Sequence, residues 1–230
     1  RCAPATSPMG ISSDRALDEA WLARPDTQFQ RHKALRDRHA PGAPIWLTET
    51  GGAACGGLRW QVAYLDTIRY LDTQARLAKQ GLDAIFTHAL ISGSNGVIDE
   101  KTLQPNATYW AALLWRRLIG TTVLDAGRQP DGLHLYAHCQ RGKPGGVTIL
   151  ALNLEATPAT ISVPERTQIY ALTATDPQNR SVMLNGQVLT LDRHDRLPVF
   201  TPLPARGGEI TIAPASVLFF TAPDARNPRC

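Results

Sequence analysis

Hydrophobic positions divide the 230-residue chain into two unlike parts that meet near residue 124. Before that point, segments with apolar residues at helical spacing alternate with short apolar runs, and after it apolar and polar residues alternate at every second position. The first spacing is typical of helices that pack on a core, and the second of half-buried strands. We therefore expect an α/β part over residues 1–123 and an all-β part over residues 124–230.

Helices and strands are expected to alternate in the first part. The pattern predicts helices from Pro25 to Ala40, over 59–79 and through 109–120, with strands at 44–47 and 83–90. This order is typical of parallel βα units. Two such units cannot close a (β/α)8 barrel, which needs eight. Residues 1–123 are therefore expected to be the C-terminal part of a barrel that an N-terminal segment or chain completes.

Short alternating runs fill the second part, with a strong hairpin signal at Asn185-Gly186. Seven strands separated by turns favour an antiparallel β-sandwich. The expected strands are 133–137, 147–152, 160–163, 168–172, 188–191, 209–212 and 216–220.

Composition and charge are those of an ordinary globular protein, with 43% hydrophobic and 19% charged residues. The sequence has no apolar run of about 18 residues and opens without the apolar stretch of a signal peptide, so we expect no membrane span and a cytoplasmic or already processed chain. The net charge of +4 suits a solvated surface or attraction to a polyanion. Without a nucleic-acid motif, an acidic polysaccharide is the favoured polyanion.

Four cysteines are present, and no two are spaced as C-x-x-C, which argues against a zinc ribbon or a thioredoxin-like site. Their even number suits two disulfides in an oxidising compartment, and four buried thiols are the alternative. The sequence shows neither a metal-ligand cluster nor a phosphate-binding loop. We therefore expect no metal and no cofactor.

Glu49 is the best candidate for a catalytic group, because it ends the apolar run 44–47 and meets a glycine-rich loop. Catalytic groups of βα barrels stand at the C-terminal ends of strands, although a surface glutamate would give the same pattern. A retaining glycosidase needs two carboxyl groups roughly 5 Å apart. No other glutamate closes a barrel strand, and Asp99 and Glu100 follow a turn and suit a structural role. The partner carboxylate is expected outside this chain.

An ordered set of motifs resembles the heparanase-like glycoside hydrolases, family 79. Trp46-Leu47-Thr48-Glu49-Thr50 with Gly56-Gly57 and Tyr70-Leu71-Asp72 carries the first part of the resemblance. It continues through Ile98-Asp99-Glu100, Tyr109–Thr121, Leu133–Cys139 and Val182–Gly186. The resemblance covers nearly the whole chain past residue 20.

This resemblance implies a retaining β-glucuronidase with Glu49 as nucleophile and the acid/base glutamate in an Asn-Glu-Pro-like motif, which this sequence lacks. The leading hypothesis is endo-cleavage of heparan sulfate or a similar glucuronate-containing glycan by a secreted or periplasmic enzyme. An exo-β-glucuronidase is the alternative within enzymes. A non-catalytic carbohydrate-binding module is the alternative of another class, because β-strands fill nearly half of the chain.

The resemblance also implies substrate contacts. The turn that contains Ser94, Asn95 and Gly96 takes the place of the family's glucuronate-binding turn, with Asn95 at the position of the family's tyrosine. His88 would line the same subsite, with a structural histidine as the alternative. Gly56 and Gly57 would form a substrate wall or a plain tight turn.

Two disulfides are the remaining expectations. The resemblance implies that Cys139 and Cys230 form a bridge that ties the all-β part to the C-terminus. Cys2 and Cys55 both fall on loops at the expected catalytic face, so they form a second bridge or stay as free thiols. The sequon Asn106-Ala107-Thr108 is interpreted as a chance match.

Overall fold

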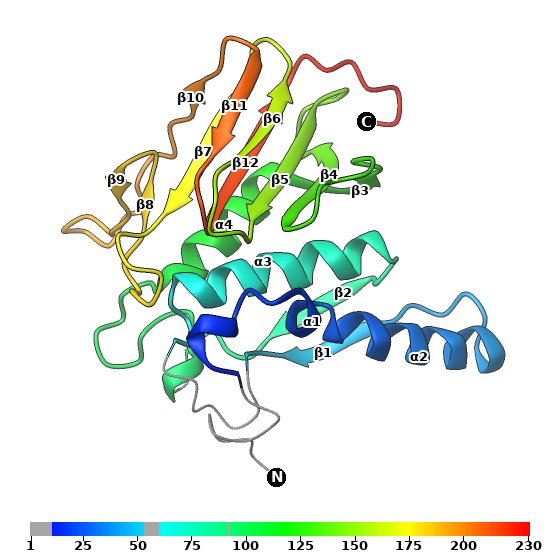
Figure 1. The fold of residues 1–230 in the computed structure, drawn as a ribbon. Helices are drawn as coiled ribbons and strands as arrows, with labels where there is room; N and C mark the ends of the chain where they lie inside the picture. The colour runs from blue at the N-terminus through cyan, green and yellow to red at the C-terminus, as the bar shows by residue number, and fades with distance from the viewer. Residues whose placement is uncertain (1–10, 53–59, 92) are drawn as a thin grey trace.

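The computed structural model describes residues 11–52, 60–91 and 93–230. Helix α3 (Tyr64–Lys79) lies between two layers: the strands β1 and β2 on one side, and a large sheet on the other (Figure 1). Gly56, Gly57, Cys2 and Cys55 fall outside the described residues. No helix among those described is long and apolar enough to cross a membrane.

The first half contains the expected alternation of helices and strands. Its helical elements and strands are η1 (Ser13–Arg15), α1 (Glu19–Leu22), α2 (Arg24–His39), β1 (Trp46–Thr50), α3, β2 (Ala84–Thr87), η2 (Gly93–Asn95) and α4 (Ala107–Leu118). The strands β1 and β2 are parallel, as βα units require.

The second half forms an eight-stranded antiparallel sheet with the order β3-β4-β5-β12-β7-β8-β9, and β10 pairs beside β7. A separate two-stranded sheet joins β6 to β11. The strands are β3 (Ile119–Leu124), β4 (Leu133–Gln140), β5 (Val147–Asn153), β6 (Ala159–Val163), β7 (Gln168–Thr173), β8 (Met183–Leu184), β9 (Gln187–Val188), β10 (Leu203–Pro204), β11 (Gly208–Ile212) and β12 (Ser216–Ala222).

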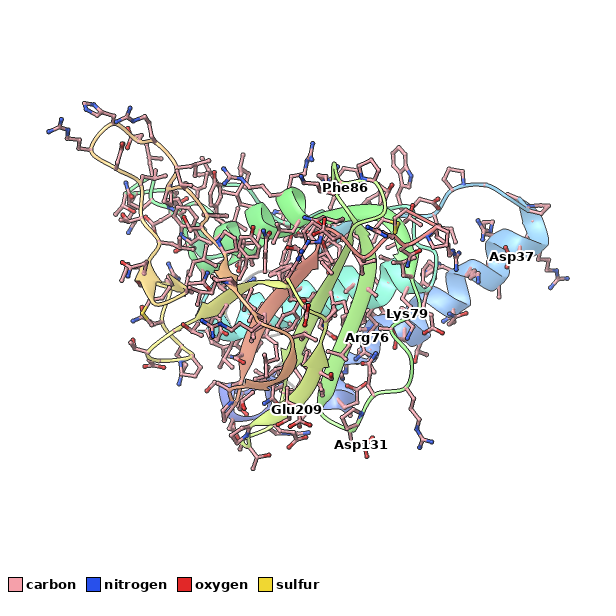
Figure 2. The ribbon with its side chains drawn as sticks, turned by 90° about the horizontal axis from the view of Figure 1, so that it is seen from above. Asp37, Arg76, Lys79, Phe86, Asp131 and Glu209 are labelled. Atoms are coloured by element: carbon pink, nitrogen blue, oxygen red, sulfur yellow. A yellow bond between two sulfur atoms is a disulfide. The ribbon has the colours of Figure 1, made fainter. Side chains whose placement is uncertain are left out.

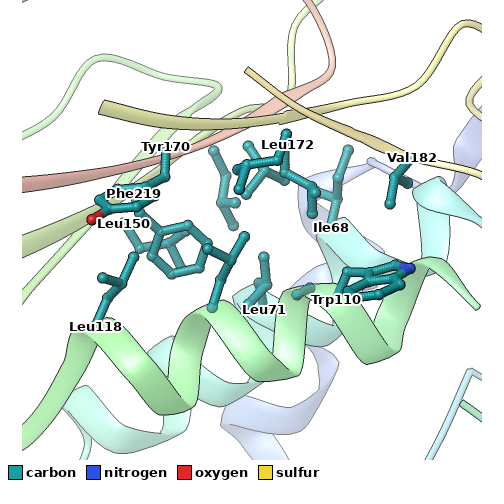
Figure 3. Close-up of a cluster of buried hydrophobic side chains, with 14 of the residues drawn as sticks. Ile68, Leu71, Trp110, Leu118, Leu150, Tyr170, Leu172, Val182 and Phe219 are labelled. Carbon is teal, nitrogen blue, oxygen red and sulfur yellow. The ribbon is translucent and has the colours of Figure 1, made fainter. Parts of the chain in front are cut away.

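One hydrophobic core joins the helices to the large sheet. Ile68 and Leu71 of α3 and Trp110 of α4 pack against Leu150 and Phe219 of the sheet (Figure 3). All five side chains are at most 1% exposed. Burial of each such side chain stabilises the fold by about 1.5–3 kcal/mol. The division at residue 123 therefore separates two patterns of secondary structure that share a core.

The opposite face of the large sheet is covered by β6 and β11. Leu133, Ala151 and Phe220 of the sheet pack with Val163 and Ile212 of this second layer. Six of the seven predicted antiparallel strands are present, β3, β8 and β10 were not predicted, and the described second layer contains two strands only. The arrangement of a full two-sheet sandwich stays a prediction.

Several boundaries predicted from the sequence are wrong. The strand predicted at 44–47 lies at Trp46–Thr50, the strand predicted at 83–90 is limited to Ala84–Thr87, and three further differences have a clear physical reason. Helix α3 begins at Tyr64 rather than near 59, because Val62 has φ 55° and Ala63 is extended. The N–H groups of Tyr64 and Leu65 donate to carbonyls of residues 179 and 177, which satisfies the open end of the helix.

The other two concern strands. Helix α4 ends at Leu118, and the β-branched stretch 119–124 continues as strand β3 along β4. Strand β9 contains only Gln187 and Val188 instead of 188–191, since the N–H of Leu189 donates to Val182 outside the ladder. The Asn185-Gly186 hairpin is confirmed: both residues have positive φ, 51° and 80°.

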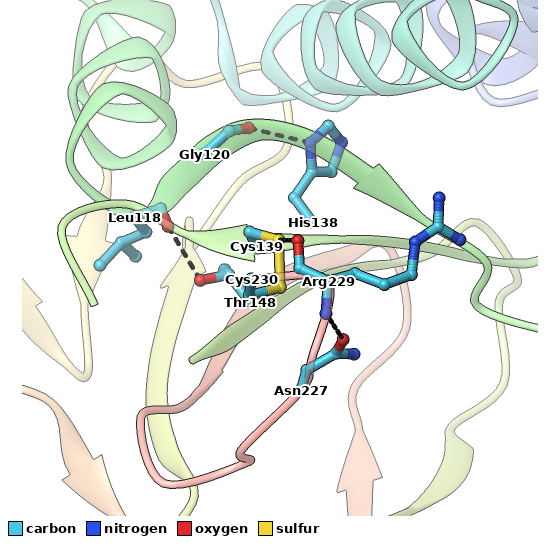
Figure 4. The surroundings of a disulfide bond; sticks show 8 residues. All are labelled: Leu118, Gly120, His138, Cys139, Thr148, Asn227, Arg229 and Cys230. Carbon is cyan, nitrogen blue, oxygen red and sulfur yellow. Dashed lines mark hydrogen bonds between the residues drawn. A yellow bond between two sulfur atoms is a disulfide. The ribbon is translucent and has the colours of Figure 1, made fainter. Parts of the chain in front are cut away.

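A disulfide links Cys139 in β4 to Cys230, with 5.3 Å between the Cα atoms (Figure 4). It closes a loop of 91 residues. Beside it, Gly120 passes so close to β4 that a Cβ atom there would lie 2.4 Å from the Cys139 carbonyl oxygen. The bond therefore anchors the C-terminal tail where the backbones of β3 and β4 approach closely.

A buried carboxylate, Asp72 of α3, connects the helices to β4. Its Oδ1 accepts from the Tyr136 hydroxyl at 2.6 Å and lies 2.7 Å from Nδ1 of His134. Its Oδ2 lies 3.0 Å from Nε of Arg76, whose other nitrogens reach Glu19 and Asp26. Burial alone would raise the pKa of Asp72, but His134 and the Arg76 guanidinium outweigh burial and lower it.

We expect that replacing both Cys139 and Cys230 by Ser lowers the free energy of unfolding by about 2–4 kcal/mol, because the unfolded chain gains the freedom of a long loop. Urea unfolding of the variant and of the oxidised wild type measures this loss. Reduction of the wild type with dithiothreitol should give the same loss, and an unchanged midpoint would contradict the expected role of the bond.

We expect Asp72→Asn to lower the free energy of unfolding at pH 7 by about 3–5 kcal/mol, because buried charged partners lose their carboxylate. Because folding lowers the pKa of Asp72, its ionised form stabilises the fold fully at pH values above its unfolded-state pKa, near 4. This stabilisation is lost as the pH falls through the folded-state pKa of Asp72. The difference in the free energy of unfolding between the wild type and Asp72→Asn should therefore become smaller below pH 4.

The matched control is Asp37→Asn on the exposed part of α2 (Figure 2), which should change stability by less than about 0.5 kcal/mol. Thermal unfolding between pH 3 and pH 7 makes the comparison. If the stability difference between the wild type and Asp72→Asn is constant across this range, ionisation of Asp72 does not stabilise the fold.

Candidate functional site

The parallel pair β1 and β2 brings the candidate residues to one edge. Trp46 pairs with Ala84 and Leu47 with Ile85, and the register shifts before Thr50 pairs with Thr87. The N–H of His88 donates to the Thr50 carbonyl at 2.9 Å. Because the carboxyl ends of parallel strands meet at the same edge, Glu49 and His88 both stand at the C-terminal edge of this pair.

Glu49 lies on β1 with an exposed side chain. Among the described residues, its carboxylate has no hydrogen bond and no ion pair. Alternation along the strand predicts Glu49 and Leu47 on one side, but the register shift after Leu47 interrupts that alternation. The carboxylate is thus open to a ligand or to a further segment of protein.

The turn after β2 is held by backbone hydrogen bonds. The N–H groups of Val97 and Ile98 donate to Ala89 and Leu90, which brings residues 93–96 back toward the end of β2. Asn95 is half-buried and Gly96 is buried. The η2 turn, which includes the backbone of Ser94, is thereby placed beyond His88 at the same edge.

Asn106, at the start of α4, holds this turn in place through two hydrogen bonds. Its side-chain Nδ2 donates to the Gly96 carbonyl at 2.8 Å, and its backbone N–H donates to Val97 at 2.8 Å. Asn106 is only 5% exposed. The sequon amide is therefore buried and occupied in the folded protein, which makes it a poor acceptor for a glycan.

Asp99 and Glu100 have the structural role that the sequence suggests. The backbone N–H and the hydroxyl of Thr102, with the N–H of Lys101, donate to Asp99 and lower its pKa. Glu100 accepts from the N–H of Gly93 at 2.9 Å. Both carboxylates thus brace the turn rather than face Glu49.

Gln61 is a site residue that the sequence patterns did not single out. It is 2% exposed, and its Oε1 has no hydrogen-bond partner among the described residues. A Cβ atom on Gly51 would lie 3.8 Å from the His88 carbonyl oxygen and 3.9 Å from Nε2 of Gln61, so both residues approach the chain directly after β1. Its place directly after the glycine-rich loop was the only available signal.

No metal-binding group of three or more His, Cys, Asp or Glu side chains occurs among the described residues. The gathered groups are a carboxylate, an imidazole, a buried amide and backbone N–H groups. This set can attack an electrophilic carbon and can hydrogen-bond hydroxyl and carboxylate oxygens.

Comparison with solved structures defines the class of fold as that of glycoside hydrolases. A rhamnosyl-glucuronidase from Fusarium oxysporum superposes with a TM-score of 0.73 over 96% of this chain and 51% of its own, at 16% identity. An α-L-arabinofuranosidase from Thermotoga maritima gives 0.65 over 93% and 50%, at 14% identity. These likenesses show the fold, and no family model matches the chain.

The curated relatives are heparanases and heparanase-like proteins, which confirms the resemblance seen in the motifs. Heparanase-like protein 1 of Arabidopsis thaliana is 34% identical over 64% of this chain and 28% of its own length. Mouse heparanase is 28% identical over 83% and 39%, and human inactive heparanase-2 is 28% identical over 88% and 39%. The chain thus spans between a quarter and two fifths of these relatives.

We expect Asn106→Ala to lower the free energy of unfolding by about 1–3 kcal/mol, because the Gly96 carbonyl loses its buried donor. Gln178→Ala, at an exposed amide, is the control and should change little. Urea unfolding measures both variants. Equal stability of the two would show that the Asn106 amide does not hold the turn.

Proposed function

We propose that this chain is the C-terminal part of a retaining glycoside hydrolase that acts on glucuronate-containing glycans, with Glu49 as its nucleophile. One observation carries the proposal: Glu49 stands exposed at the C-terminal edge of a parallel strand pair, beside His88 and the turn 93–96. The heparanase relatives support the glycan class.

The reaction would proceed by two displacements. The Glu49 carboxylate attacks the anomeric carbon and the glycosidic C–O bond breaks, while a second carboxylic acid protonates the leaving oxygen. Water, deprotonated by that same second group, then cleaves the glycosyl ester and frees Glu49. We propose that this acid/base group lies on a protein segment outside this chain.

That segment would also complete the barrel around residues 1–123, and the antiparallel strands over 124–230 would form the sandwich of the same enzyme. Exposed aromatic rings support this proposal, because Trp46 and Phe86 on β1 and β2 are 58% and 50% exposed. A cavity of about 270 Å³ lies between α2 and β1. Apolar barrel strands are normally covered on both sides.

The proposed substrate contacts come from residues at the same C-terminal edge of β1 and β2. We propose that His88, Asn95 and the backbone at Ser94 and Gly96 bind the glucuronate, and that Gly56 and Gly57 line the opposite wall. A secreted or periplasmic location suits both this substrate and the disulfide. Endo-cleavage is preferred, with exo-cleavage of a terminal glucuronate as the alternative.

A non-catalytic glycan-binding role is the second candidate. It is favoured by one specific observation: a relative that spans 88% of this chain is named inactive heparanase-2. In that case the candidate site would still bind the glycan, but Glu49 would form no covalent bond to it.

The test is incubation of the complete protein with a 2-deoxy-2-fluoro-glucuronide, followed by intact-mass measurement and peptide mapping. We expect one adduct, on the peptide that contains Glu49. Glu49→Gln should lose the adduct and lower kcat on an aryl glucuronide by roughly 10³-fold or more, because covalent catalysis is removed.

Glu209→Gln is the matched control, because Glu209 is an exposed glutamate on β11 that neither reaches nor faces the candidate site. It should keep both the adduct and the activity. An adduct on another carboxylate would show that the nucleophile is misassigned. A folded protein that forms no adduct and still binds the glycan would favour the non-catalytic candidate.

A further inference from the structure

A cavity of about 340 Å³ lies where the two halves of the chain meet, apart from the β1 and β2 edge. The segment 99–106 and the first turn of α4 form one wall, and residues 180–190 around the β8 and β9 hairpin form the other. The volume is within the range of small-molecule sites. The polar residues that line it and that the argument uses are Gln104, Trp110, Arg180 and Ser181.

Trp110 presents an unused donor at this cavity. The residue is 1% exposed and lines the cavity, and its indole nitrogen makes no hydrogen bond within the described residues yet is not one of the fully buried atoms that lack a partner. Figure 3 shows the indole nitrogen on the side of the ring toward Val182, at the margin of the hydrophobic cluster. The N–H therefore opens into the cavity, where a ligand oxygen can accept from it in place of water.

Arg180 supplies the charge. Its only described partner is Asp99, whose Oδ2 lies 3.6 Å from NH1, which is too long for a hydrogen bond. Asp99 itself is occupied by the donors of residues 101 and 102. The remaining guanidinium N–H groups are therefore available, and the planar guanidinium suits a carboxylate or a sulfate.

Further neutral groups complete the lining. Among the described residues, neither the Gln104 amide nor the Ser181 hydroxyl makes a side-chain hydrogen bond, and Val188 adds an apolar wall that is 60% exposed. Amide and hydroxyl groups match sugar hydroxyls, and apolar walls match the C–H faces of a pyranose ring.

We propose that this cavity is an accessory binding site for one anionic sugar unit, such as a uronate, of a polysaccharide chain. Arg180 binds the acidic group, and the Trp110 N–H donates to a ring substituent. The sugar class rests on the proposed function, whereas the site itself rests on the cavity and its unpaired donors. Segment 99–106 continues directly from the turn 93–96, so a long glycan can engage both places.

The test is ¹H–¹⁵N spectroscopy of the complete protein with ¹⁵N-labelled tryptophan, titrated with sodium D-glucuronate. The Trp110 indole resonance is assigned by its absence in Trp110→Phe. We expect it to shift saturably with a millimolar dissociation constant. Arg180→Gln should weaken binding about tenfold, and neutral methyl β-glucoside should bind at least about tenfold more weakly than glucuronate.

The matched control is Arg193→Gln, an exposed arginine whose described side-chain partner is its neighbour His194. It should leave the titration unchanged. No indole shift up to roughly 100 mM glucuronate, or an equal shift in Arg180→Gln, would overturn the site. Equal binding of the glucoside would overturn the anionic class. Because the readout is Trp110, these outcomes do not depend on whether Glu49 forms an adduct.

Discussion

Helix α3 has to bury side chains on opposite sides, and the arrangement of the other layers follows from this constraint. Ile68 and Leu71 enter the core shared with the large sheet, while Leu65 packs with Trp60 in a smaller cluster and Leu77 lines the cavity beside β1. A helix that is covered on two sides cannot carry an ordinary solvated face. Its charged residues therefore need partners inside the protein, and Asp72 finds them in Tyr136 and His134 of β4 and in Arg76 of α3 itself.

This double burial fixes the strands that carry the candidate site. β1 and β2 lie on one side of α3 and the large sheet lies on the other, so the helix sets the position of the two strands relative to that sheet (Figure 1). The turn after β2 then returns to α4 through Asn106. The candidate site is thus supported by hydrogen bonds of the backbone and by helix packing, while Glu49 itself has no described partner that would restrict its chemistry.

Apolar patterns predicted most of the elements. Burial alternates along β7, whereas β12 is buried from Ser216 to Thr221 because both faces of the large sheet are covered, and its apolar run predicted it. Helix α4 has helical spacing of its apolar residues, and α2 was recognised from its start at Pro25 although it buries only Phe29. The start of α3 was not predictable, because the groups that satisfy its first N–H groups come from residues 177–179, more than 100 positions later. β3 was hidden since its apolar residues continue the pattern of α4 without a break.

The site was predictable to a smaller extent. Glu49 is a candidate from the sequence because a strand end and a glycine-rich loop mark it locally. The one local signal for Gln61 is its place directly after the glycine-rich loop, and Arg180 has none. They become candidates only when the folded chain leaves the Gln61 amide oxygen without a described partner and places the Arg180 guanidinium at a cavity, and these are properties of tertiary structure.

The open edge of β1 has a practical consequence for preparing the protein. Within the described residues, β1 pairs with β2 alone, so one side of β1 presents unpaired backbone groups next to the exposed rings of Trp46 and Phe86. Such an edge is a template for pairing with a second molecule. Residues 1–230 produced in isolation should therefore associate through β1 as concentration rises, and the same residues attached to a segment that covers this edge should remain dispersed.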